Sequence, residues 1–259
     1  MSISMVSPNG EVRRSTALFL AASWGVALLV LWALSPVHTL PSPREVVSAL
    51  GGLWWNAGLG PELAATLRLV GVALVVSVAI SLPLAWASVV PAVRPLTSAV
   101  AKLRFLGLTG LVFPFTLATG GGFALKVTLL VFGMSTFLVT AVARIVAEVP
   151  QTSLDHARTL GASELRATFE VVVRGTLDRT LDAIRQNVAM GWAMITMVEG
   201  IARSDGGVGA LLLAENKHFK LAEVYAILAV ILVVGLLIDL AMGVLAKVVC
   251  PHAAPRSKS

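Results

Sequence analysis

Residues 69–90 read LVGVALVVSVAISLPLAWASVV, a run without a single charged side chain. A helix needs about 20 mostly apolar residues to cross the hydrocarbon core of a bilayer, so this run predicts a membrane span. Arg68 and Arg94 lie on either side of it. Pro83 falls inside the run, and because proline removes one backbone hydrogen bond from a helix, we expect a kink near it.

The rest of the chain has the same character. Of its 259 residues, 57% are hydrophobic and only 13% are charged, whereas a soluble domain carries about 25% charged residues. The chain therefore lacks both the polar surface of a soluble globule and the solvated composition of a disordered protein. This composition predicts an integral membrane protein.

Five further segments predict spans, which makes six transmembrane helices in an all-α protein: residues 16–35, 105–125, 127–143, 186–198 and 224–246. The first segment could also be a signal peptide. It is long for the apolar part of such a peptide, however, and residues 35–38 make a poor cleavage site, so we expect an uncleaved span.

Segment 105–125 is interrupted by residues that loosen or break a helix: Gly107, Gly110, Pro114 and the glycine triplet 120–122. We interpret it as a short, irregular span followed by a tight turn at the triplet. Irregular backbone at membrane depth is tolerated where protein or a water-filled path covers it. Phe113, Phe115 and Thr116 are therefore candidates to line a translocation pathway. The alternative is that the glycines only allow close helix packing.

Three further polar or aromatic side chains lie in or near the later spans. Trp192 is in the middle of span 186–198 and Glu199 follows its end, so both are pathway candidates. Core packing is the alternative for Trp192, and a solvated carboxylate at the outer interface is the alternative for Glu199. We expect Asp239, inside the last span, to form an ion pair with Arg185 rather than to relay protons.

The basic residues predict the orientation of the chain. With six spans, fourteen Lys and Arg residues fall on the side of both termini and six on the other side. Excess basic residues mark the cytoplasmic side. We therefore expect a cytoplasmic N-terminal segment at 1–15, one six-helix domain at 16–246 and a basic cytoplasmic tail at 247–259. This pattern accounts for the net charge of +6, and without a basic and aromatic stripe no nucleic-acid binding is expected.

The predicted cytoplasmic loop at 144–185 has its own helical pattern. Pro150 ends the preceding helix, and Thr152 with Asp155 forms a capping-box-like pair at the start of a short helix over 153–160. Six acidic residues offset six arginines across this loop. An ordinary amphipathic loop on the membrane surface is the alternative interpretation.

Gly161 divides the loop into an elbow of two helices. Glycine supplies the left-handed residue that ends a helix, and a second helix is predicted over 163–173. The elbow would present a slim tip at Ala157 and Gly161, with polar contacts from Asp155 and His156.

Residues 149–163, VPQTSLDHARTLGAS, resemble the "EAA" loop of permease subunits of binding-protein-dependent ABC importers, whose pattern is E-A-A-x-x-x-G followed by I-x-L-P. Within it, the stretch TLGAS at 159–163 is most similar to the nitrate, sulfonate and taurine branch of this family. The likeness extends over roughly residues 40–247, and its other matching stretches include LPSP at 40–43, LPL at 82–84, GWA at 191–193 and GVG at 207–209.

The resemblance implies a type I ABC importer permease fold in the inner membrane, surrounded by lipid. It implies separate ATPase subunits that grip the elbow, an extracytoplasmic solute-binding protein, and a second permease copy, with a homodimer favoured over a heterodimer. The solute would be small and anionic, such as nitrate, sulfonate, taurine or bicarbonate. The residues carried over to ATPase coupling are Leu154, Asp155, His156, Ala157, Gly161, Ala162 and Ser163.

No residues for catalysis, cofactor binding or metal binding are expected in this chain. The phosphate-binding pattern G-x-x-x-x-G-K-[ST] is absent from the sequence, so ATP and Mg²⁺ would be bound by the partner ATPase. The four histidines are scattered and the single cysteine, Cys250, forms no cysteine metal site. An ion-coupled secondary transporter and a divergent heterodimer half or assembly protein are the alternative functions.

The elbow departs from the family pattern at three places. Asp155 stands where the family has glutamate, His156 stands where it has the first alanine, and the Val-Arg pair at 173–174 replaces Leu-Pro. These departures bear on the strength of ATPase coupling.

Overall fold

The computed structural model describes residues 14–34, 40–202 and 205–250, and each regular element in those ranges is helical. The prediction of an all-α protein is confirmed. In chain order, the elements are α1 (Arg14–Ala33), α2 (Pro43–Trp55), α3 (Leu59–Trp86), η1 (Ala87–Val89), α4 (Arg94–Lys102), η2 (Leu103–Phe105), α5 (Leu108–Thr119), α6 (Gly122–Ala147), α7 (Gln151–Thr159), α8 (Glu164–Thr168), the π-helix η3 (Phe169–Arg174), α9 (Leu177–Ile201), α10 (Val208–Lys217) and α11 (Leu221–Val249).

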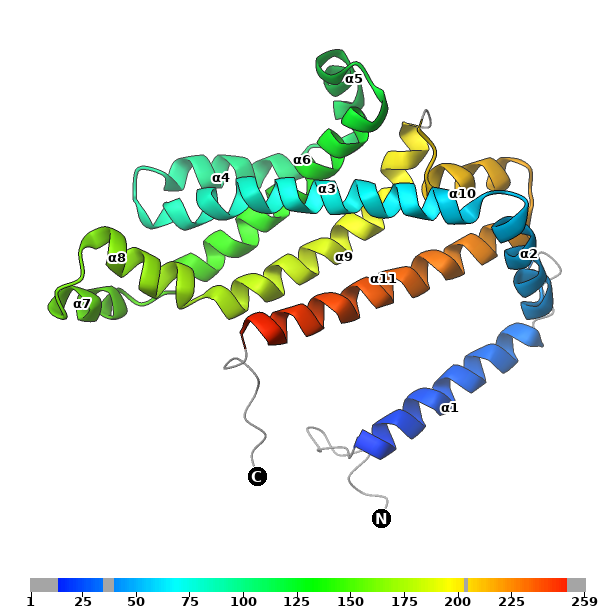
Figure 1. Cartoon of the computed structure of the whole chain (residues 1–259), viewed down its shortest axis with the longest axis horizontal. Coiled ribbons are helices and arrows are strands. Elements are labelled where there is room, and N and C mark those ends of the chain that lie inside the picture. Colours follow the sequence, from blue (N-terminus) through cyan, green and yellow to red (C-terminus); the bar gives the residue numbers. More distant parts are fainter. Residues whose placement is uncertain (1–13, 35–39, 203–204, 251–259) are drawn as a thin grey trace.

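Helices α3, α6 and α9 form the centre of the molecule, and α11 lies alongside α9 (Figure 1). A row of small residues at every fourth position of α3 is fully buried: Ala73, Ser77, Ser81 and Ala85. The Ser81 hydroxyl contacts the backbone oxygen of Ser135 on α6 at 3.5 Å. In a membrane no hydrophobic force drives two helices together, and small side chains allow their backbones to pack closely instead. The most extensive packing between two described helices is accordingly that of α3 with α6.

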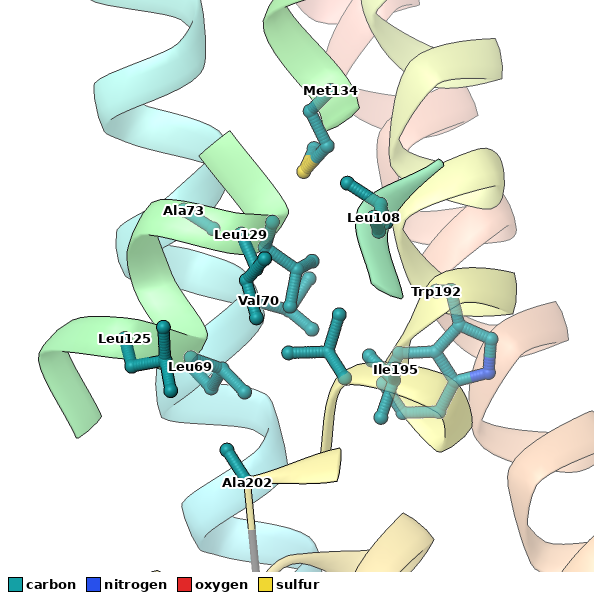
Figure 2. Packing of buried hydrophobic residues seen from close by; sticks show 12 residues of the cluster. Leu69, Val70, Ala73, Leu108, Leu125, Leu129, Met134, Trp192, Ile195 and Ala202 are labelled. Carbon is teal, nitrogen blue, oxygen red and sulfur yellow. The ribbon is translucent and has the colours of Figure 1, made fainter. Parts of the chain in front are cut away.

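The buried apolar side chains gather in two main clusters along these helices. One combines Leu69 and Val70 of α3 with Leu129 of α6 and Trp192 and Ile195 of α9, as Figure 2 shows. The other surrounds the end of α6 that leads into α7. We call the end of the molecule where α6 leads into α7 the elbow end, and the opposite end, near α10, the far end (Figure 1).

Four helices in the described part of the chain are long and apolar enough to cross a membrane: Ser15–Ala33, Leu59–Val89, Gly122–Ala147 and Leu221–Val249. They overlap the predicted first and second spans and contain the predicted fourth and sixth spans. The predicted fifth span lies inside α9, whose first half carries Asp178, Arg179, Asp182 and Arg185. These charges keep α9 outside the apolar set, although its 25 residues give a length of about 37 Å. The count of six spans remains a prediction.

The predicted third span is a bent pair of helices. The segment Arg94–Phe105 meets α5 at 110°, which describes either a broken span or a re-entrant loop. The tight turn at the glycine triplet is confirmed, because α5 ends at Thr119 and Gly120, Gly121 and Gly122 have φ angles of 77°, 93° and 64°. Only glycine adopts such angles without strain.

The structure also contains elements that lie outside the predicted spans. Helix α2 begins with a capping box between Ser42 and Glu45 and packs against α11. Helix α1 stands apart from the central helices (Figure 1) and is joined to the segment before α2 by the Trp32 indole, which donates to the Pro41 carbonyl at 3.0 Å. Most of the predicted segments 1–15 and 247–259 lies outside the described residues.

Candidate functional site

The predicted elbow is present as α7, α8 and the π-helix η3. Gly161 has φ = 84°. Its amide donates to the Arg158 carbonyl at 2.9 Å, and the Ala162 amide donates to the Ala157 carbonyl at 3.1 Å. These two bonds make the paired helix ending known as a Schellman motif. The left-handed glycine predicted at the tip is therefore confirmed.

Arg158 clamps the two arms of the elbow together across Gly161. Its guanidinium binds Asp155 on α7 at 2.6 Å and Glu164 on α8 at 2.8 and 2.9 Å. Pairing with Glu164, and then with Asp155, raises the pKa of Arg158, while Arg158 lowers the pKa of Glu164. Because the groups are solvent-exposed, the clamp selects the angle between the helices more than it adds stability.

The elbow has a buried root and an exposed apolar tip. Leu154 is buried in the elbow-end cluster, where it lies with Val172 and Val146. At the tip, Leu160 is 88% exposed and Leu165 is 86% exposed. Two leucines that project from a short, fixed turn form a surface suited to burial against another protein. Of the predicted coupling residues, Asp155, His156, Gly161 and Ser163 are exposed, while Ala157 and Ala162 are partly buried.

Two details of the elbow prediction are wrong. Helix α7 begins at Gln151, and its N-cap residue Pro150 makes no side-chain capping bond. Asp155 does not cap the helix, because its carboxylate binds Arg158 instead. The predicted second arm over 163–173 is confirmed to within one residue at each end, because helical residues run from Glu164 through the π-helix to Arg174.

A cavity of about 500 Å³ opens between α6 and α9 at the elbow end. Arg104, Arg144 and Arg179 line it together with one acid, Asp182. Arg179 also forms an ion pair with Glu148. The remaining polar lining comes from Thr140, Gln186 and Asn187, and the buried Asn187 carboxamide donates to the Met134 carbonyl at 2.9 Å while its oxygen has no protein partner. The charge of this cavity favours an anion.

The predicted pathway residues do not converge on one cavity. Phe115 packs edge to face with Phe132 at 5.7 Å, while Phe113 is 73% exposed. The Thr116 hydroxyl donates to the backbone of its own helix. Trp192 belongs to the buried cluster shown in Figure 2. Its indole donates to the Ile231 carbonyl at 2.9 Å. Trp192 also lines a cavity of about 460 Å³ between α9 and α11, so its place in the pathway stays a prediction.

Glu199 is buried rather than solvated, with 1% of its surface exposed. Its carboxylate accepts hydrogen bonds from the Thr66 hydroxyl and the Gly209 amide, both at 2.7 Å. It lines a smaller cavity of about 310 Å³ at the far end, together with Arg68, Lys126 and Asp205. Lys126, which sequence reasoning placed between two spans, is only 2% exposed.

The predicted ion pair between Arg185 and Asp239 is confirmed. The guanidinium binds both carboxylate oxygens, at 2.6 and 2.5 Å, and so joins α9 to α11. Within the described residues, no group of three or more His, Cys, Asp and Glu side chains is placed to hold a metal ion.

Comparisons with known proteins agree with this geometry. The chain is 26% identical over 243 residues to the taurine transport system permease protein TauC of Escherichia coli strain K12, which covers 91% of this chain and 86% of that protein. Two solved structures share the fold. The MetNI methionine ABC transporter in inward-facing conformations matches with a TM-score of 0.61 and 16% identity over 81% of this chain and 99% of that chain. An amino acid ABC transporter with histidines matches with a TM-score of 0.63 and 17% identity, over 76% of this chain and 97% of that chain.

A family match covers most of the chain. Residues 69–251 match the family described as the binding-protein-dependent transport system inner membrane component. This range contains the elbow, the arginine-lined cavity and the central helices α6 and α9. The chain therefore belongs to the inner-membrane permeases of binding-protein-dependent ABC importers.

Proposed function

We propose that this permease carries a small anionic solute into the cell, driven by separate ATPase subunits that bind its elbow. The observation that carries the proposal is the elbow itself, in which Gly161 and Arg158 hold two exposed leucines in one fixed shape. The chain is a transport subunit, and ATP and Mg²⁺ bind to its ATPase partner.

The elbow faces the cytoplasm in this proposal, and both termini lie on the same side. The distribution of basic residues supports this orientation. Arg104, Arg144 and Arg179 gather at the elbow end, as expected for the cytoplasmic side. The far end, with α10, then faces the solute-binding protein.

Leu160 and Leu165 would enter a groove on the ATPase. Full burial of one leucine side chain stabilises a complex by about 1.5–3 kcal/mol before the costs of association. Leu154 would hold the root of the elbow in place, since it is packed among residues of α6 and η3. A force on the tip would then reach α9, which follows η3 in the chain.

The cavity with three arginines would be the inner end of the solute pathway. A sulfonate or similar acid group forms charge-assisted hydrogen bonds with guanidinium groups. The relation to a taurine transport permease supports a solute with a sulfonate-like acid group. Arg104 and Arg144 are the candidate contacts, because Arg179 is already paired with Glu148.

The permease would work as two identical copies surrounded by lipid. Leucine and valine side chains on α1 and α11 are exposed in the single chain, among them Leu28, Leu232 and Leu236. Such faces are suited to lipid or to a second copy.

The test is to replace the apolar tip and measure ATPase binding. We expect Leu160→Asp to reduce co-purification of the system's ATPase with the permease by at least about tenfold, since a charge would stand where the proposed complex buries a leucine. Phe219→Asp is the matched control, because Phe219 is equally exposed but lies at the far end. A Leu160→Asp permease that still binds ATPase and imports solute would contradict the proposal. Uptake driven by an ion gradient without any ATPase would favour a secondary transporter instead.

The solute class has a separate test. In vesicles that contain the assembled transporter, Arg144→Ala should raise the KM for taurine uptake about tenfold or more, as expected for loss of a hydrogen bond to a charged group. Lys102→Ala is the control, because Lys102 is a nearby exposed cation that does not line the cavity. Equal KM values for the two variants would remove the arginine cavity from the pathway.

A further inference from the structure

A polar cluster at the far end binds four consecutive residues of the chain to three different helices. We call it the outer polar cluster, and it consists of Glu62 and Thr66 of α3, Lys126 of α6, Glu199 of α9 and the backbone of residues 206–209. Lys126 donates to the Gly206 carbonyl at 2.7 Å, the Gly207 amide donates to Glu62, the Val208 amide donates to Thr66 at 2.9 Å, and the Gly209 amide donates to Glu199 at 2.7 Å.

The glycines at 206 and 207 are required by this arrangement. Their φ angles are 65° and 109°. A Cβ atom on Gly206 would overlap the Glu62 carboxylate, and one on Gly207 would overlap the Glu199 carboxylate. The two carboxylates therefore contact the backbone itself, which fixes residues 206–209 more closely than contacts between side chains would.

Glu199 is the member of the cluster that joins α9 to the other elements. One of its oxygens accepts from Thr66 on α3 and the other from the Gly209 amide in the first turn of α10. Thr66 in turn accepts from the Val208 amide. The positive end of a helix favours a carboxylate at this place. Glu199 thus caps α10 from a different helix, and both of its oxygens are used.

The position of Glu199 along α9 gives this contact a mechanical meaning. Helix α9 begins at Leu177, directly after the elbow, and Glu199 lies in its last turn. A continuous helix transmits a tilt along its whole length. A movement imposed at the elbow therefore reaches α10 and the 206–209 segment through the two hydrogen bonds of Glu199.

We infer that Glu199 is a positioning residue that couples movement of the elbow to the outer face of the permease. This inference rests on the proposed function and deepens it. Glu62 and Lys126 hold the same segment from α3 and α6, but neither belongs to the helix that the elbow moves. Within the outer polar cluster, the contacts of Glu199 are therefore the coupling contacts, and the contact of Glu62 with the same segment serves as the control.

The test compares Glu199→Gln with Glu62→Gln in the full transporter, with ATPase and solute-binding protein, in lipid vesicles. Solute uptake and ATP hydrolysis are measured in the same vesicles. Coupling free energies of ordinary size correspond to roughly 5–150-fold effects, so we expect solute transported per ATP to fall at least about fivefold in Glu199→Gln. The ratio should stay within about twofold of the parent in Glu62→Gln.

A second pair of variants protects the test against misfolding. Thr66→Val keeps the side-chain volume but removes the hydroxyl, and it should lower the same ratio, whereas Thr66→Ser should restore it. An unchanged ratio in Glu199→Gln and Thr66→Val would overturn the inference. Equal losses in the Glu199 and Glu62 variants would also overturn it, because they would indicate a structural role only. If the unsubstituted permease does not bind the ATPase through its elbow, the proposed function itself is refuted.

Discussion

Replacing Gly161 by valine tests whether the shape of the elbow determines ATPase binding. Gly161 has φ = 84°, and a Cβ atom added there would meet no other atom within 4 Å. The cost of a larger residue is therefore purely conformational, because no neighbouring group has to move. This separates the shape of the turn from the chemistry of its surface.

The magnitude follows from the backbone angle. A left-handed conformation costs a residue other than glycine about 1–2 kcal/mol, and a β-branched residue lies at the upper end. An energy of this size lowers the ratio of bent to unbent elbow by roughly 5–30-fold. If only the bent elbow binds, the apparent affinity for the ATPase falls by up to the same factor.

The assay is the Kd of the purified ATPase for permease in lipid nanodiscs. The expected order of affinity is Gly161, then Gly161→Asn, Gly161→Ala and Gly161→Val, because asparagine tolerates the left-handed region better than alanine or valine. Gly51→Val is the control, since Gly51 lies in α2, has open space around it and does not have a positive φ. A Gly161→Val permease with the parent Kd would refute the role assigned to the turn.

Three other outcomes are expected. The pKa of Glu164 is depressed in the folded protein, so its pairing with Arg158 stabilises the elbow above the ordinary glutamate pKa of about 4.3 and is lost as pH falls through the lower folded value. Protection of the amides of residues 155–164 against hydrogen exchange, relative to the intrinsic rate at each pH, should therefore fall at low pH. Arg158→Ala should remove that pH dependence. Asp239→Asn should lower the thermal unfolding temperature in detergent, because it removes the carboxylate that the Arg185 guanidinium binds. Exchanging the two charges in an Arg185→Asp, Asp239→Arg double variant should restore part of the loss, and a double variant less stable than either single one would contradict the pairing. Trp192→Ala should cost about 3–5 kcal/mol without changing the KM for solute, whereas a changed KM at unchanged stability would place Trp192 in the pathway.

The uncharged runs of the sequence predict the four long apolar helices well, because a helix that crosses lipid requires such a run. The start of α3 was missed by ten residues, since Glu62 and Arg68 precede the apolar run but belong to the same helix. Helix α2 carries a signal that could have been used, a serine followed three residues later by glutamate, with proline at the first helical position. Helix α2 is too short and too polar to cross a membrane, so an uncharged run of span length does not mark it.

The elbow was predictable because its contacts are local. Gly161, Arg158 and Glu164 lie within seven residues of one another, so spacing alone brings them together. The outer polar cluster was not predictable in the same way. Thr66 and Glu199 are 133 positions apart, and neither has a local pattern that marks it as buried. Only the adjacent glycines at 206 and 207, which leave room for two carboxylates, pointed to a close approach of the backbone.

The row of small side chains on α3 limits which parts of the permease move. Ala73, Ser77, Ser81 and Ala85 bring the backbones of α3 and α6 together without long side chains that could rearrange between them. We expect two helices packed in this way to move together. A passage that opens on alternate sides of the membrane would then form where other helices tilt against this pair, and the small side chains of α3 would define the part of the protein that stays fixed.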